Sequence, residues 1–207
     1  MPRPQPYLPP WRAGRALISI PVFALIAVLF AACGHGEQPK SSASGPSRPD
    51  EAKTVEQTYL GAMANHHRIS IAMGKVARKR GEADFVTRSA DVMVSTQKRE
   101  IGQMRLIHKR LFGSALRPDR NAHDVLGLSV AEAELAHSAA PRNALLAVDR
   151  LDRSYVSALI PHHRGAIRMS RVVLRSAQDP ALRNLAETII ATQRREVQRL
   201  RAFRRRM

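Results

Sequence analysis

The chain has 207 residues, of which 44% are hydrophobic and 25% charged, and its formal net charge is +17 at pH 7. This composition is typical of a globular protein, and it excludes a disordered chain and a protein with many membrane spans. The only cysteine, Cys33, excludes an intramolecular disulfide framework, a CxxC redox pair and a cysteine-based zinc finger. The length fits one domain preceded by a leader and a linker.

The N-terminal region has the pattern of an export signal. Three arginines and no acid occur in the first 15 residues, and the apolar run that follows to Ala32 is shorter than the roughly 20 residues of a membrane span. Small residues stand directly before Cys33, similar to a lipobox, although Phe30 replaces the usual leucine. We therefore predict a lipoprotein-type signal peptide over residues 1–32 and a lipid anchor on Cys33 in the cell envelope, with the domain on the extracytoplasmic side. An uncleaved N-terminal anchor is the alternative, and it would also export the protein.

The rest of the chain divides by composition into a tether and one domain. Residues 33–50 are rich in Gly, Ser and Pro, which predicts a flexible tether. The domain that follows is expected to contain a first helical hairpin (51–113), a crossover (114–148) and a second helical hairpin (149–207).

An internal repeat with an offset of 96 residues organises this domain. Without any gap, 15 of the 53 pairs between positions 59–111 and 155–207 are identical. Two copies of this length indicate a duplicated hairpin rather than a solenoid. In each copy apolar residues recur at steps of three and four, which predicts two amphipathic helices, and Ser129 with Glu132 resembles a capping box of a short helix in the crossover. The predicted fold is therefore all-α, a four-helix bundle of two repeated hairpins joined by a long crossover that contains a short helix.

Polar residues interrupt the apolar stripes at places that should face the core. Six of them occupy equivalent positions in the two copies: His66, Gln97 and Glu100 in the first, and His162, Gln193 and Glu196 in the second. His66 lies 16 residues before the turn expected near residue 82, and Glu100 lies 18 residues after it, so the two should lie at the same height. We therefore expect His66 to approach Gln97 or Glu100, and His162 to approach Gln193 or Glu196. A buried carboxylate needs such a partner, because burial without one is costly.

Two interpretations of these polar residues remain open. One is a buried His–Glu/Gln network that fixes the register of a structural or partner-binding bundle. The other is a metal site, because imidazole, carboxylate and thioether together form a donor set that suits copper. The candidate metal ligands are His66, His67, Met63, Met73, Met93, Glu100 and Met104 in the first copy and His162, His163, Met169 and Glu196 in the second, with Gln97 and Gln193 as supporting polar residues.

The two copies differ in their thioethers. Three methionines of the first copy are replaced in the second: Met63, Met93 and Met104 correspond to Leu159, Ile189 and Leu200. Because soft sulfur ligands favour Cu(I) over Zn(II) or Mn(II), we expect the first copy to bind Cu(I) more tightly than the second.

At these positions the sequence resembles the bacterial domain of unknown function numbered 305. The hallmark of that family, a His-His pair with Ala-Ile-x-Met on one helix and Gln-x-x-Glu-Ile on the next, is similar to residues 66–73 with 97–101 and to residues 162–169 with 193–197. The resemblance covers roughly residues 55–205 and implies a ferritin-like helical bundle that is exported. Some members of the family are linked to copper binding and copper tolerance, which makes copper the expected cofactor. The second copy departs from the pattern at Leu200, where the first has Met104.

Other functions find less support in the sequence. A di-iron oxidase needs a Glu-x-x-His pair on each of two helices, and the only match is Glu134 with His137 in the crossover. No nucleophile triad or nucleotide-binding glycine loop occurs, so we predict that the protein is not an enzyme. The single histidines His108, His123 and His137 are expected to face solvent, with the alternative that His108 extends the inner stripe of its helix. The arginine-rich segment 194–206 lacks interleaved aromatic residues, so we expect contact with anionic lipid head groups and not with nucleic acid; protein partners are not predicted.

Overall fold

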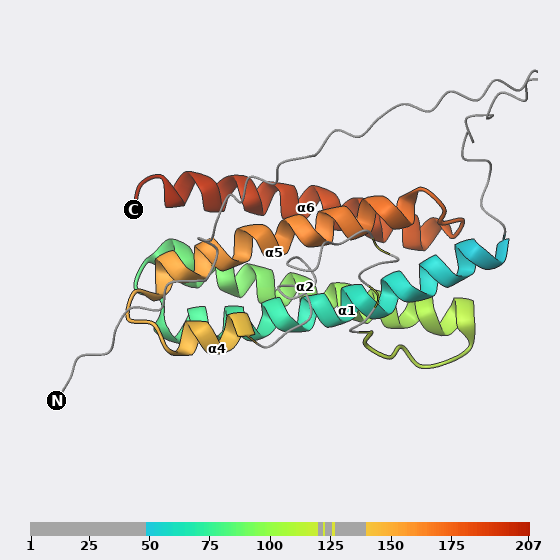
Figure 1. Cartoon of the computed structure of the whole chain (residues 1–207), viewed down its shortest axis with the longest axis horizontal. Helices are drawn as coiled ribbons and strands as arrows, with labels where there is room; N and C mark the ends of the chain where they lie inside the picture. Colours follow the sequence, from blue (N-terminus) through green and yellow to red (C-terminus); the bar gives the residue numbers. More distant parts are fainter. Residues whose placement is uncertain (1–48, 120–121, 123–125, 127–139) are drawn as a thin grey trace, which may run out of the picture. The chain divides into compact units, whose positions relative to one another are not determined.

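The structure is a computed structural model that describes residues 49–119, 122, 126 and 140–207. Within these residues the chain forms helices α1 (Pro49–Arg80), α2 (Asp84–Phe112), α4 (Ala140–Leu146), α5 (Leu151–Leu174) and α6 (Pro180–Arg204), and no strand. The predicted all-α fold, with a short helix in the crossover, is confirmed (Figure 1). The leader with Cys33, and the crossover residues Ser129, Glu132, Glu134 and His137, lie outside the described residues.

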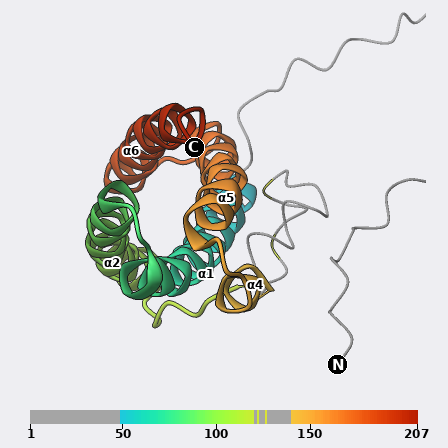
Figure 2. The same ribbon diagram turned by 90° about the vertical axis from the view of Figure 1, so that its left-hand side faces the viewer.

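The four long helices form a ring when the bundle is seen from its end, in the order α1, α2, α6, α5 (Figure 2). The helices of each hairpin pack closely together, α1 packs against α5, and α2 and α6 form the loosest of these contacts. Helix α4 lies outside the ring against α1 and α5. No described helix is long and apolar enough to cross a membrane.

Local sequence sets the helix ends. Helix α6 begins at the Asp179-Pro180 pair, where Asp179 Oδ1 accepts a hydrogen bond from the backbone N–H of Leu182 at 2.8 Å. Helix α2 ends at Gly113, which adopts a left-handed conformation (φ 69°) and donates its N–H to the carbonyl of Lys109 at 3.0 Å.

Each hairpin turn is closed by a carboxylate from the other hairpin. Asp152 of α5 accepts hydrogen bonds from the backbone N–H groups of residues 82 and 83, at 3.2 and 2.8 Å. Glu56 of α1 accepts from those of residues 178 and 179, at 2.8 and 3.4 Å. Positions 56 and 152 are equivalent in the 96-residue repeat, so the repeat in the sequence is also an approximate two-fold symmetry of the contacts.

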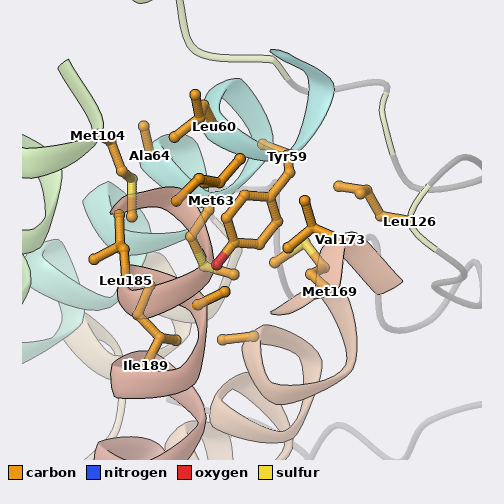
Figure 3. Packing of buried hydrophobic residues seen from close by; sticks show 14 of the residues in the cluster. Tyr59, Leu60, Met63, Ala64, Met104, Leu126, Met169, Val173, Leu185 and Ile189 are labelled. Atoms are coloured by element: carbon orange, nitrogen blue, oxygen red, sulfur yellow. The ribbon is translucent and has the colours of Figure 1, made fainter. Parts of the chain in front are cut away.

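The buried apolar residues form two clusters, each drawn from both hairpins. One surrounds Tyr59 and contains Met63, Met104 and Met169 (Figure 3). The other contains Met73 and Met93 and packs around Tyr155. The methionines of the first copy are therefore divided between the two clusters instead of gathering within their own hairpin.

Candidate functional site

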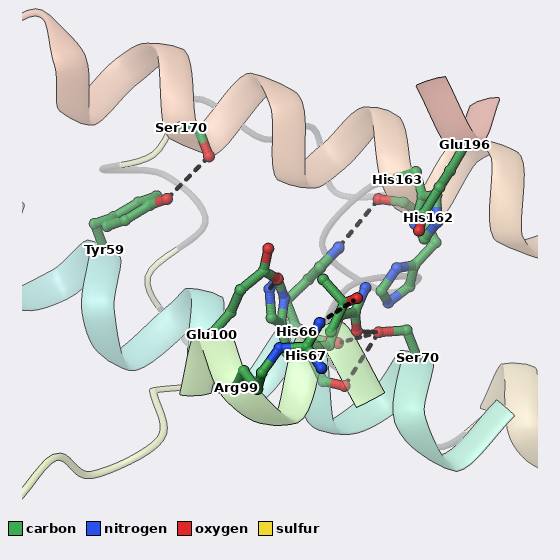
Figure 4. Close-up of polar contacts among 12 residues, drawn as sticks. Tyr59, His66, His67, Ser70, Arg99, Glu100, His162, His163, Ser170 and Glu196 are labelled. Atoms are coloured by element: carbon green, nitrogen blue, oxygen red, sulfur yellow. Dashed lines mark hydrogen bonds and ion pairs between the residues drawn. The ribbon is translucent and has the colours of Figure 1, made fainter. Parts of the chain in front are cut away.

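Two histidine–glutamate pairs lie at equivalent places in the bundle (Figure 4). His67 Nε2 on α1 and Glu100 Oε2 on α2 are 2.7 Å apart and hydrogen-bonded. His163 Nε2 on α5 and Glu196 Oε2 on α6 are also 2.7 Å apart, but their orientation falls outside hydrogen-bonding geometry. We expected His66 to approach Gln97 or Glu100, and His162 to approach Gln193 or Glu196. At the two glutamates the contact is made by the second histidine of each pair, His67 and His163. Successive residues of a helix point about 100° apart, so only one of two adjacent histidines can face the neighbouring helix of its hairpin.

His66 and His162 face each other across the bundle instead. Their rings stack with centroids 3.7 Å apart at 27°, and His66 Nε2 donates a hydrogen bond to the backbone carbonyl of His162 at 3.0 Å. Both side chains are buried. This contact between α1 and α5 therefore joins the two hairpins at the centre of the repeat, apart from the two His–Glu pairs.

The buried glutamines of the two copies, Gln97 and Gln193, differ in their hydrogen bonds. Ser70 Oγ donates a hydrogen bond to Gln97 Oε1, but alanine, Ala166, occupies the equivalent position in the second copy. Both polar atoms of the buried Gln193 amide consequently lack a hydrogen-bond partner among the described residues. The role of Ser70 was not predicted, although its position one turn after His66 on the same helix was a usable signal.

The tyrosines repeat this difference. The Tyr59 hydroxyl lies 2.9 Å from Ser170 Oγ, within hydrogen-bonding distance. Tyr155 holds the equivalent place, but glycine, Gly74, stands opposite it, and its buried hydroxyl has no partner in the described part of the chain. Burial raises the pKa of both phenols well above the ordinary value, so both stay neutral. Polar groups are thus better satisfied around the first His–Glu pair than around the second.

A cavity of about 230 Å³ reaches the second pair from outside. His163 and Glu196 lie in its lining together with Met93 of α2, and Leu159 and Leu200 form part of the apolar wall. The Glu196 side chain is accordingly 16% exposed, whereas that of Glu100 is 6% exposed. Met93, which the sequence assigned to the first copy, therefore belongs to the surroundings of the second pair.

Two other methionines belong with the first pair. Met63 lies one helical turn before His67, and Met104 lies one turn after Glu100, on the same helix faces. The residues equivalent to them, Leu159 and Leu200, line the cavity beside His163 and Glu196. The first pair therefore has a thioether one turn away on each of its helices, and Met93 lines the cavity beside the second pair. Met73 and Met169, the other candidate thioethers, lie in the apolar clusters around Tyr155 and Tyr59. The expected asymmetry in Cu(I) affinity stays a prediction.

The donor set fits a soft metal ion better than a hard one. In residues 49–119 and 140–207, no group of three or more His, Cys, Asp or Glu side chains could hold a metal ion. Hard divalent ions need several oxygen or nitrogen ligands. Nδ1 of His67 and Nδ1 of His163 are buried without a hydrogen-bond partner there, and thioethers lie close to each pair. The imidazole and the thioether sulfurs suit copper, the sulfurs Cu(I) in particular, and the carboxylate is the hard member of the set.

One further histidine follows the alternative given for it. His108 is buried on the inner side of α2, and its Nδ1 donates a hydrogen bond to the carbonyl of Ser114 at 3.0 Å. It fixes the start of the crossover against α2 and lies apart from both pairs.

Solved structures with the same fold include a copper protein. CopM in its Cu(II)-bound form is 22% identical over 73% of this chain and 96% of its own, with a TM-score of 0.62. CopM in its Cu(I)-bound form is also 22% identical, with the same coverage of both chains and a TM-score of 0.61. A putative secreted DUF305 protein from Streptomyces coelicolor is 19% identical over 72% of this chain and 91% of its own, with a TM-score of 0.62.

Sequence comparison gives one short match and one long one. The uncharacterized protein L153 of Acanthamoeba polyphaga mimivirus is 39% identical over 46 residues, which are 22% of this chain and only 30% of that protein. Residues 56–204 match the family described as Domain of unknown function (DUF305). This match spans both hairpins and both His–Glu pairs and confirms the resemblance seen in the sequence: the chain belongs to the DUF305 family.

Proposed function

We propose that the protein binds Cu(I) at two sites and sequesters copper in the cell envelope. The observation that carries the proposal is the pair of buried His–Glu contacts flanked by thioethers, at 2.7 Å in both hairpins. The Cu(I)-, Cu(II)- and Ag-bound structures of CopM give independent support, because that protein shares the fold. At 22% identity the likeness extends to the fold alone, so copper binding by this chain needs its own test.

Each proposed site has named ligands. The first would use His67, Glu100, Met63 and Met104, and the second His163, Glu196 and Met93. Thioether sulfur and imidazole favour Cu(I). Burial keeps competing water ligands away from the first site, whereas the second opens into the cavity. Copper bound at the first site would be held in a soft, largely dry environment, which suits storage better than catalysis.

The test is a competition titration with a Cu(I) chelator under anaerobic conditions. Met63→Leu together with Met104→Leu gives the first site the side chains of the second while nearly conserving volume. We expect the Cu(I) affinity of the first site, the tighter one in the wild type, to fall roughly 10–100-fold in this double variant, by analogy with the cost of perturbing the surroundings of a metal. Met207→Leu changes an exposed methionine at the C-terminus and is the matched control; its affinity should equal that of the wild type.

Two results would contradict the proposal. If the wild-type protein binds no Cu(I) at micromolar concentration, the two His–Glu pairs and the glutamines beside them form only a structural network. The hydrogen bonds of Ser70 to Gln97 and of Tyr59 with Ser170 already favour that second candidate function, a structural or partner-binding bundle. If the double variant and the control bind Cu(I) with the same affinity, Met63 and Met104 are not ligands of the first site.

We also propose that the protein is exported and anchored through a lipid on Cys33. Support comes from the sequence alone: an arginine-containing start, a short apolar run and small residues before the only cysteine. Mass spectrometry of the membrane fraction should find a lipidated chain that begins at Cys33, and Cys33→Ala should abolish both cleavage and lipidation. An intact leader in the wild type would refute the anchor.

A further inference from the structure

The contact between α2 and α6 has a hollow at each end, but only one of the two reaches a His–Glu pair. We call the end at His163 and Glu196 the open end and the other the closed end. The 230 Å³ cavity includes His163, Glu196 and Met93 in its lining. A second hollow, of about 290 Å³, lies over the equivalent part of the other end and is lined by Gln103, Leu185 and further residues. Neither His67 nor Glu100 belongs to its lining, so it stops short of the first pair.

Several exchanges of side chains between the copies coincide with this difference. Ser89 lines the cavity on α2, and leucine, Leu185, occupies the equivalent position on α6. Leu185 is buried in the cluster around Tyr59, where it fills the space that a serine leaves open. The leucines in the cavity wall, Leu159 and Leu200, are also shorter than the methionines that replace them at the closed end.

The two ends of the α2–α6 contact are also held together differently. Arg110 at the end of α2 donates two hydrogen bonds, at 2.7 and 2.8 Å, to the carboxylate of Asp179 at the start of α6. Such bidentate pairs are among the stronger polar contacts, and this one lowers the pKa of Asp179. The equivalent positions at the open end are Ala83 and Arg206, which cannot form an ion pair. There the two helices meet through the stacked rings of Phe85 and Phe203, with centroids 4.4 Å apart.

The charge at the mouth of the cavity differs as well. Arg88 and Arg199 are exposed residues of the cavity lining, and their equivalents at the closed end are Asn184 and Gln103. Two guanidinium groups repel a free cation and attract an anionic complex. Arg88 also pairs with Asp84 at 2.9 Å, which leaves Arg199 as the stronger attraction.

We propose that the cavity is the route by which Cu(I) reaches and leaves the His163–Glu196 site, delivered as an anionic complex of a soft donor. Met93 is the thioether that such a complex meets in the cavity, so ligands are exchanged there without any change in the oxidation state of copper. The His67–Glu100 site, closed and richer in sulfur, exchanges slowly and acts as the store. This inference rests on the copper-binding function proposed above.

Transfer kinetics test the route separately from copper affinity. Protein loaded with two equivalents of Cu(I) is mixed with excess bicinchoninate without oxygen, and the coloured Cu(I)–bicinchoninate complex is followed in time. We expect a fast and a slow phase in the wild type. His163→Ala should remove the fast phase and His67→Ala the slow one, which assigns each phase to its site.

Ser89→Leu gives the open end the leucine that the closed end has at the equivalent position, Leu185. We expect it to lose the fast phase, so that all copper leaves slowly, while the equilibrium affinity measured by competition stays that of the wild type. Ser95→Leu makes the same change on the exposed face of the same helix, where the serine hydroxyl also bonds only to backbone carbonyls. It should keep both phases. Arg199→Gln should slow loading from the anionic Cu(I)–bicinchoninate complex, and added salt should remove that difference from the wild type.

Each outcome decides one point. Wild-type kinetics in Ser89→Leu with normal affinity would overturn the cavity as the route and leave copper binding intact. A single phase in the wild type would overturn the division into an open site and a store. Wild-type protein without bound Cu(I) would overturn this inference together with the proposed function.

Discussion

Replacing Glu100 by alanine should lower the free energy of unfolding of the metal-free protein by about 1–3 kcal/mol, the usual cost of leaving a buried hydrogen-bonding group without its partner. His67 is fully buried, and its Nε2 would lose the acceptor that now lies 2.7 Å away. The equivalent change, Glu196→Ala, should cost only about 1 kcal/mol or less, since its contact with His163 lies outside hydrogen-bonding geometry and water can replace it. The reason is the cavity, which leaves the Glu196 side chain 16% exposed and brings solvent to the pair.

Urea unfolding followed by circular dichroism measures these differences. Glu187→Ala removes an exposed carboxylate from α6 and serves as the control, with an expected change within about 0.5 kcal/mol. If Glu100→Ala proves no more destabilising than Glu187→Ala, the hydrogen bond between Glu100 and His67 does not stabilise the fold. Equal, large losses in Glu100→Ala and Glu196→Ala would show that the cavity does not admit water to the second pair.

Met104→Ala should destabilise the protein by about 2–5 kcal/mol, since it opens a void in a packed core. Met104 is completely buried between Met63, Leu185 and Ile189 in the cluster around Tyr59 (Figure 3). Leu200→Ala, the equivalent change in the second copy, should fall at the lower end of this range or below it. Leu200 already borders a cavity, so its removal enlarges a void and loses fewer contacts.

Thermal unfolding of four variants separates packing from sulfur chemistry. Met104→Leu keeps the volume and should cost less than about 1.5 kcal/mol. Leu106→Ala alters a side chain of the same helix that is 74% exposed, and it should be close to neutral. A Met104→Ala protein as stable as Leu106→Ala would contradict the packing described for the cluster around Tyr59.

The architecture could be predicted because the repeat is strong. An ungapped offset of 96 residues fixes two equal hairpins, and the distances of Glu100 and His66 from their turn place them at the same height. The choice between His66 and His67 could not be made, because it depends on how far α1 rotates about its own axis. Packing against α5, through the stacked rings of His66 and His162, sets that rotation.

The surroundings of each pair were harder to predict for a different reason. A hairpin-by-hairpin comparison gives Met93 to the first copy, because it lies on α2. The structure brings it to His163 and Glu196 across the contact between α2 and α6, helices that are not adjacent in the chain. At the cavity, Ser89 takes the place that Leu185 holds in the hollow at the other end. The sequence shows this exchange, but only a comparison of the two hollows connects it with access to a His–Glu pair.

Glu56 and Asp152 each close the turn of the other hairpin, which suggests how such a chain could arise. A protein with one hairpin would carry the acceptor for a turn that it does not contain, and its own turn would lack one. Two copies associated around a two-fold axis would satisfy both turns at once, as a homodimer whose assembly depends on concentration. Fusion of the genes makes that association intramolecular. It also frees the two halves to diverge, so that one carries Ser70 and three methionines where the other carries an alanine and three aliphatic residues.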